Sequence, residues 1–311
     1  MTWVVVALTA YFILAVANLL DKFLIDNVLL SSKAYAFAAC ILGLIIFLIA
    51  PWFLHWPGLS LFILDLLAGF IFAVALWMLY EALQRGEASR ILVTVGGTTP
   101  IFSLIFSILF FKEQFSNNQL IGISLLLIGV FVIAILPKDR TYLSRVLRKL
   151  KMKQNIKSGG LLIALLSAFS YSLYFICTKY VYSFQPFLSA FIWTRLGAAI
   201  LVSFFLLSKN NRYKILHSFT KKNKNKRNFL VVVNQVFGSL GFVLQNYAIY
   251  LGSVTIVNAL QGVQYAFLLI ISAIIALLAP KLLKETFSWP IVLQKTAAVI
   301  IIGTGLYFLA S

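Results

Sequence analysis

The sequence predicts an all-α integral membrane protein whose ten transmembrane helices form two inverted five-helix repeats. Three observations lead to this fold class. The 311-residue chain is 62% hydrophobic and only 11% charged, which lies outside the range of soluble domains. Its apolar residues fall into long unbroken runs, and one short polar motif occurs twice, once in each half of the chain.

Each apolar run is long enough for a membrane-spanning helix. Such a helix needs about 20 mainly apolar residues, because each residue adds ~1.5 Å and the hydrocarbon layer is ~30 Å thick. Strands of a membrane barrel would instead alternate polar and apolar residues. We place the spans at residues 3–20, 34–54, 60–83, 88–111, 119–136, 159–181, 187–207, 229–250, 254–279 and 289–310.

The basic residues indicate which side of the membrane each connection faces, because Lys and Arg are retained on the cytoplasmic side. If the N-terminus is outside, the cytoplasmic connections hold all 26 basic residues except Lys112, Lys179, Arg195 and Lys295. We therefore predict a multi-pass protein of the plasma (inner) membrane with both termini outside. The basic loops 137–158 and 208–228 are then cytoplasmic and solvated.

The net charge of +18 does not indicate a nucleic-acid partner, since neither basic loop shows aromatic residues interleaved with its charges or a folded binding module. Such segments attract anionic headgroups, so membrane lipids are expected partners. Cys40 and Cys177 stand alone in apolar spans, which indicates neither a disulfide framework nor a metal site. The first span lacks a basic leader region and a cleavage site, so it is interpreted as a retained helix.

The repeated motif is 112-KEQFS-116 and 284-KETFS-288, and each copy precedes the last span of a half. The predicted units are a first repeat at 1–136, a basic linker at 137–158 and a second repeat at 159–311. Each repeat has five spans, an odd number, so the second repeat enters the membrane from the opposite side. Such halves are related by a pseudo-twofold axis in the membrane plane, and many secondary transporters use this arrangement for alternating access.

These features together resemble the EamA type of the drug/metabolite transporter superfamily. The resemblance rests on 80-YEALQRGEAS-89, the midspan Pro100, 112-KE-113 and a final span of the first half with Gly122 and Gly129. It covers nearly the whole chain. It implies a ten-helix carrier for small metabolites, amino acids or drugs, with the substrate cavity between the halves, no cofactor and no catalysis.

Ionisable residues inside spans are candidate functional residues, because a charge there costs roughly 2.5 to 3.5 kcal/mol. Arg195 lies about 12 Å from the outer end of its span at ~1.5 Å per residue, and could hold a carboxylate or phosphate or form a structural pair. Asp65 and Glu81 are weaker candidates for a proton-coupling carboxylate. Lys295 is explained by snorkelling.

Neutral polar residues mark a second candidate region near the middle of the membrane. The fourth span contains 94-TVGGTTP-100 and the ninth contains 258-NALQGVQY-265, at matching depths of the two halves. We expect these clusters to meet around the pseudo-twofold axis, either lining a cavity or holding helices together. The candidate residues of these and neighbouring spans are Thr98, Thr99, Asn258, Gln261, Gln264, Tyr265, Gln235 and Asn246, with Trp77, Tyr80, Tyr171 and Tyr174 as aromatic walls.

The predicted function is secondary transport of a small metabolite, amino acid or drug-like solute by a monomer or homodimer. A flippase for a lipid-linked sugar or headgroup is the alternative. An enzyme is not predicted, because His55 and His217 are the only histidines and both lie in connections. The sequence also lacks a phosphate-cradling glycine-rich motif and an HExxH motif.

Overall fold

The computed structural model describes residues 2–25, 31–85, 88–134, 159–218, 224–278 and 289–310, and the regular structure in these ranges is helical. The long α-helices of the first half are α1 (Thr2–Ile25), α4 (Leu59–Arg85), α5 (Ala88–Phe111) and α6 (Asn117–Ala134). Between α1 and α4 lie α2 (Ser32–Leu42), the 3-10 helix η1 (Gly43–Ile49) and α3 (Ala50–Phe53). The second half contains α8 (Gly160–Tyr182), α9 (Phe187–Ser203), the 3-10 helix η2 (Phe204–Leu207), α10 (Lys209–Ser218), α11 (Lys224–Leu251), α12 (Val254–Ala259), α13 (Gln261–Leu278) and α14 (Trp289–Ala310).

Helices cover every predicted span. By length and composition, the segments able to cross a membrane among the described residues are Ser32–Phe53, Leu59–Arg85, Thr94–Phe111, Gly160–Tyr182 and Phe187–Leu207. Shorter apolar helices lie at Thr2–Asn18, Asn117–Val132, Val254–Leu268 and Thr296–Leu309. The helices are thus those of a multi-pass membrane protein, whereas ten crossings and the inverted repeats stay predictions.

The structure corrects three details of the predicted elements. The second span is not one α-helix but α2, η1 and α3 in succession, with Pro51 in the first turn of α3, where its missing N–H costs nothing. The predicted solvated loop 208–228 contains α10 and the start of α11. The ninth span is interrupted at Leu260, between α12 and α13, whereas α5 continues as a helix through Pro100.

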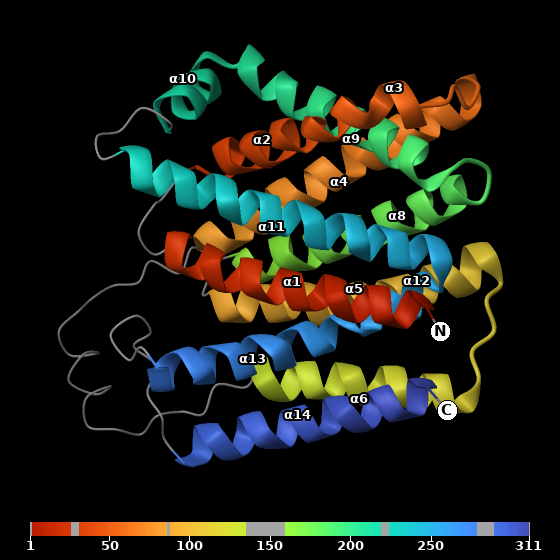
Figure 1. The fold of residues 1–311 in the computed structure, drawn as a ribbon, viewed down its shortest axis with the longest axis vertical. Coiled ribbons are helices and arrows are strands. Elements are labelled where there is room, and N and C mark those ends of the chain that lie inside the picture. The colour runs from red at the N-terminus through yellow and green to blue at the C-terminus, as the bar shows by residue number, and fades with distance from the viewer. Residues whose placement is uncertain are drawn as a thin grey trace.

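The helices lie roughly alongside one another, with both termini at the same end of the bundle (Figure 1). The pair α6 and α14 forms one edge, next to α13, and α2, α9 and α10 lie toward the other edge (Figure 1). In the middle, α1 packs against α11, α4 packs against α8 and α9, and α5 packs against α8 and α12. The candidate residues are carried mainly by these central helices.

Apolar and polar side chains are distributed as in a protein surrounded by lipid. Large apolar side chains face outward, for example Leu207 at 79% and Leu48 at 73% exposure. Polar side chains, in contrast, are buried in the interior, and the charged residues Asp65 and Arg195 are among them at 0% and 6% exposure. Intramembrane polar groups normally face the bundle interior, so this distribution supports the membrane assignment.

The central helices approach one another at glycine. A Cβ atom added at Gly69 on α4 would lie 2.1 Å from the Thr194 carbonyl oxygen of α9, and one at Gly197 would lie 2.4 Å from the Leu66 carbonyl oxygen. The backbones of α4 and α9 therefore touch, which small residues allow in membrane helices. This contact positions Arg195, which lies on the same stretch of α9.

The first copy of the repeated motif ends one helix and begins the next. Lys112 adopts a left-handed φ of 51° directly after α5, and the Glu113 N–H donates back to the Ser107 carbonyl. Ser116 and Gln119 then form a capping box, in which each side chain accepts a hydrogen bond from the other residue's backbone N–H at 2.9 and 3.2 Å. The second copy, 284–288, and the linker 137–158 lie outside the described residues.

Candidate functional site

Arg195 lies in an aromatic enclosure at the centre of the bundle. Its guanidinium carbon lies 4.1 Å from the ring centroid of Phe72 on α4, 4.7 Å from Phe191 on α9 and 5.1 Å from Phe242 on α11. Aromatic faces attract a desolvated cation by roughly 2 kcal/mol. Within the described ranges no carboxylate pairs with Arg195, so the rings partly replace water around an otherwise uncompensated charge.

Hydrogen bonds hold the Arg195 head group in place on one side only. Arg195 Nη2 donates to the Tyr174 hydroxyl at 2.9 Å, and Tyr174 donates to Asn246 Oδ1 at 2.8 Å. Asn246 also accepts from Tyr182 at 3.3 Å and donates to the Phe242 carbonyl. Arg195 Nε, in contrast, is buried without a partner. The arrangement therefore leaves donor capacity and positive charge for an acceptor that the described residues do not supply.

A second polar network joins α5 to α8 and α12. Ser172 on α8 donates to the Thr99 carbonyl at 2.7 Å and lies 3.1 Å from the Ser103 hydroxyl, which also accepts from Asn258 Nδ2 at 2.9 Å. One turn further, Thr255 bonds Ser107 at 3.0 Å. Asn258 Oδ1 is buried and has no partner. This network connects the two halves of the chain across its middle.

The two predicted polar clusters do meet, at one point. The Tyr265 hydroxyl donates to the Leu92 carbonyl of α5 at 2.7 Å, directly over Gly96, where an added Cβ would lie 2.1 Å from the Tyr265 oxygen. Glycine is therefore required at position 96 for this contact. Because Leu260 interrupts the helix, Asn258 and Tyr265 do not share one continuous helix, yet both reach α5.

The side chains of several predicted residues take no part in these networks. The Thr98 and Thr99 hydroxyls bond the carbonyls of Thr94 and Val95 on their own helix, so they point along α5. Trp77 packs on Phe205 and under the Lys33 ammonium, and Tyr80 packs on Tyr35. Among the described residues, none of the remaining amides hydrogen-bonds to either network: the half-buried Gln235 and Gln261 and the buried Gln264.

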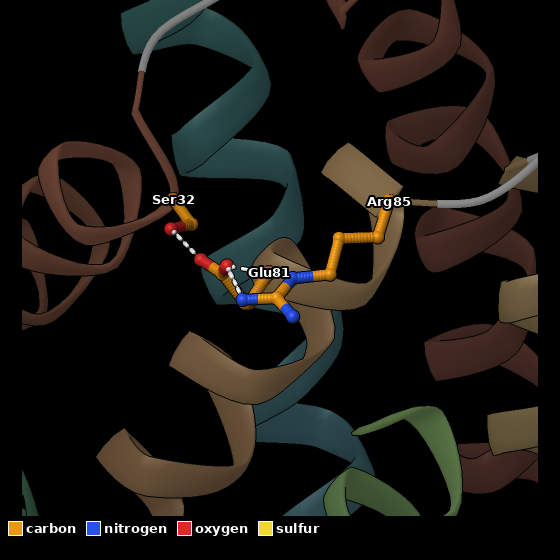
Figure 2. A network of polar contacts seen from close by, with 3 residues as sticks. All are labelled: Ser32, Glu81 and Arg85. Carbon is orange, nitrogen blue, oxygen red and sulfur yellow. Dashed lines mark hydrogen bonds and ion pairs between the residues drawn. The ribbon is translucent and has the colours of Figure 1, made fainter. Parts of the chain in front are cut away.

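Glu81 is engaged at the end of α4, in the network that Figure 2 shows. It accepts the Ser32 hydroxyl at the start of α2 and forms an ion pair with Arg85 one turn later, with N–O distances of 2.6 and 2.9 Å. Its role in the structure is to join α2 to α4. The side chain of Lys295 lies outside the described part.

Asp65 is fully buried and contacts the other half of the chain. Gln185, in the connection between α8 and α9, donates from Nε2 to Asp65 Oδ2 at 2.7 Å. Asp65 Oδ1 and Gln185 Oε1 are both buried without a partner. Asp65 and Gln185 therefore present two hydrogen-bond acceptors, Asp65 Oδ1 and Gln185 Oε1, with no donor between them.

A comparison with protein families gives a match over most of the chain. A family model described as the EamA-like transporter family matches residues 1–135 and 158–310. The chain belongs to the EamA-like transporter family. It is therefore a multi-pass membrane protein of a transporter family, and the predicted resemblance is confirmed. Members of the family are transporters, which argues against an enzymatic role.

Individual relatives of this EamA-like transporter match only in part. The chain is 35% identical over 137 residues to the uncharacterized transporter YdfC of Bacillus subtilis, covering 43% of this chain and 39% of that protein. It is 41% identical over 58 residues to the uncharacterized protein MJ1333.1 of Methanocaldococcus jannaschii, covering 19% of this chain and 42% of that protein. The matches thus span about two fifths of each relative's length.

A solved crystal structure has the same fold as this EamA-like transporter. The two superpose with a TM-score of 0.66 at 14% sequence identity, covering 98% of this chain and 95% of the other. At this identity the likeness concerns the fold alone.

The residues that enclose Arg195 carried little signal in the sequence of this EamA-like transporter. Phe72, Phe191 and Phe242 are three of 28 phenylalanines, and nothing in their spacing separates them from lipid-facing ones. Gln185 lies in a short connection that the sequence gives no reason to place against Asp65. Ser103 and Ser172 were detectable only as polar residues at midspan.

Proposed function

We propose that the protein is a secondary transporter that moves a small organic anion, a metabolite, amino acid or drug-like solute with a carboxylate or phosphate group, by alternating access. The proposal of an anionic substrate rests on the buried Arg195, which has no carboxylate partner among the described residues. Guanidinium groups bind carboxylate and phosphate through paired hydrogen bonds. The substrate would complete the hydrogen bonds of Arg195 opposite Tyr174.

Energetics favour a ligand over a purely structural role for Arg195. Burying an ionised side chain costs several kcal/mol even after relaxation, and only well-placed partners offset this cost. The faces of the aromatic rings and the Tyr174 hydroxyl offset part of it for Arg195. A bound anionic substrate would offset the rest of this cost.

Alternating access is supported by packing that recurs between the halves. If α1 corresponds to α8 and α4 to α11, the contact of α1 with α11 corresponds to that of α8 with α4, and both are extensive. Likewise α5 packs on α8 and α13 packs on α1, and α6 packs on its counterpart α14. The matched segments 1–135 and 158–310 agree with the same division.

Not every pair of helices follows this symmetry. The contact between α4 and α9 is extensive, whereas the described residues of the corresponding pair, α11 and α2, have no comparable contact. In the proposed cycle the two pairs exchange: α4 leaves α9 on one side of the membrane as α11 closes on α2 on the other. The Arg195 site lies between α4 and α9 and is thereby exposed to each side in turn.

The test of the anion site compares two variants in proteoliposomes. Arg195→Gln removes the charge, so uptake of carboxylate and phosphate solutes should fall at least about tenfold, as expected when a charged hydrogen bond of ~1.5–3 kcal/mol is lost. Lys209→Gln removes an exposed charge of α10 and should leave uptake unchanged. Unchanged uptake in correctly folded Arg195→Gln would remove Arg195 from the site.

A further inference from the structure

We propose that Asp65 and Gln185 form a proton-binding site whose occupancy couples a proton gradient to transport. The inference rests on the proposed carrier function and extends it to the driving ion. Its starting observation is the pair of buried acceptors without donors, Asp65 Oδ1 and Gln185 Oε1, on two side chains that are 0% and 8% exposed. Buried polar atoms without partners are rare and call for a physical reason.

A single proton satisfies both atoms. A carboxylic acid facing a carboxamide forms two hydrogen bonds in opposite directions, N–H to one carboxyl oxygen and O–H to the amide oxygen. The first of these is present, from Gln185 Nε2 to Asp65 Oδ2 at 2.7 Å. A proton on Asp65 Oδ1 supplies the second bond. It also removes a buried negative charge that the described residues leave without a cationic partner, which is the costly state in a low-dielectric interior.

A metal ion fits this site less well than a proton. A bound cation of the sodium or calcium type takes several oxygen ligands, whereas the buried side-chain oxygens without a partner in the described part of this site are Asp65 Oδ1 and Gln185 Oε1. Within the described ranges, no group of three or more His, Cys, Asp or Glu side chains is placed to hold a metal. A proton needs one carboxyl oxygen and one acceptor, and both are present.

The surroundings of Asp65 contain few other ionisable groups. From α8, Tyr182 lies within electrostatic range of both Asp65 and Arg195, with Tyr171 and Tyr174 further along that helix. The ionisable groups on the other neighbouring helices are Arg195 on α9 and Cys40 on α2, and Cys40 lies within electrostatic range of Arg195. The α5 helix carries only Arg90, at the end away from Asp65, and the exposed His55 ring contacts the Phe53 carbonyl through Nδ1. Within the described ranges, none of these groups hydrogen-bonds to Asp65.

The location of the pair gives the proton a mechanical consequence. Asp65 is on α4, whereas Gln185 immediately precedes α9, so the hydrogen bonds join the two helices that Gly69 and Gly197 bring into contact. The protonated pair stabilises this closed contact. Loss of the proton leaves an uncompensated carboxylate there, which favours separation of α4 from α9. Proton binding and release are thus linked to the exchange of helix contacts in the proposed cycle.

The test combines an infrared titration with transport. In purified protein, the spectrum of the wild type minus that of Asp65→Asn should contain the carbonyl stretch of one protonated carboxyl group, and this difference band should disappear as pH is raised. Gln185→Ala removes the acceptor and should shift the same band. Absence of a band assignable to Asp65 would overturn the proposal without reference to transport.

In proteoliposomes, an inward pH gradient should drive accumulation by the wild type. Asp65→Asn mimics the protonated state, so accumulation should be lost while exchange without a gradient is retained; Glu113→Gln, a half-buried acid outside both sites, is the control. Unchanged gradient-driven accumulation in Asp65→Asn, or accumulation driven by sodium instead, would overturn the proposal. If the wild type showed no exchange at all, the carrier function would fail, and the infrared titration would still decide whether Asp65 binds a proton.

Discussion

At the scale of single residues, Arg195 and Asp65 are the two buried charges on which the proposed transport depends. Arg195 and Asp65 were predictable because a charge inside an apolar run is costly and therefore has a reason. The aromatic enclosure and Gln185 were not predictable, since they depend on which helix faces belong together. The hydroxyls of Thr98 and Thr99 bond carbonyls of their own helix, and their part in a substrate site stays a prediction.

Tyr174→Phe tests the hydrogen bonds that position Arg195. The substitution removes one hydroxyl from between the Arg195 guanidinium and Asn246, both buried. We expect a loss of about 1–3 kcal/mol in stability and a higher KM for the anionic substrate, because the charge stays while its orientation is lost. Tyr171→Phe, on the neighbouring turn and without a recorded hydrogen bond, is the matched control. Equal melting temperatures and KM values for the two variants would contradict the positioning role of Tyr174.

At the scale of elements, long apolar runs were sufficient to predict the helices, and α5 and α14 even have the predicted bounds. The break at Leu260 was not predictable, because no proline or paired glycine precedes it. The α5 helix, in contrast, continues through Pro100. Breaks in membrane helices depend on the neighbours that satisfy the freed backbone groups, and those neighbours are tertiary information.

The glycine contact between α4 and α9 gives a prediction at this scale. Gly69→Ala adds a Cβ that would lie 2.1 Å from the Thr194 carbonyl oxygen, so the helices must move apart. We expect a lower melting temperature, corresponding to roughly 1–3 kcal/mol as for other overpacked interiors, and slower transport. Gly238→Ala on α11 adds its Cβ in open space and should leave the melting temperature unchanged or raised. Similar melting temperatures of the two variants would contradict the close approach.

At the scale of the whole molecule, the repeated KEQFS motif and the charge distribution predicted two halves of opposite orientation. The structure explains the first motif copy as the junction of α5 and α6, which is an architectural role and not a chemical one. Both termini lie at one end of the bundle, as an even number of crossings requires (Figure 1). Orientation in the membrane depends on the charge bias alone and stays a prediction.

Orientation is tested by single cysteines in a background without Cys40 and Cys177. A cysteine at Lys209 on α10 and one at the C-terminal Ser311 should react on opposite sides of the membrane with an impermeant thiol reagent. We expect labelling of the C-terminal position in intact cells and of position 209 only after permeabilisation. Labelling of position 209 from outside would reverse the predicted topology.

The most direct test of the central claim, that this protein carries a small anion by alternating access, is counterflow in proteoliposomes. Vesicles loaded with unlabelled solute should transiently accumulate the labelled solute from outside, because a carrier returns loaded faster than empty. The account predicts counterflow for solutes with a carboxylate or phosphate and its loss in Arg195→Gln. Flux without counterflow would indicate a static pore. Scrambling of lipid headgroups without any solute counterflow would instead support a flippase and contradict the account.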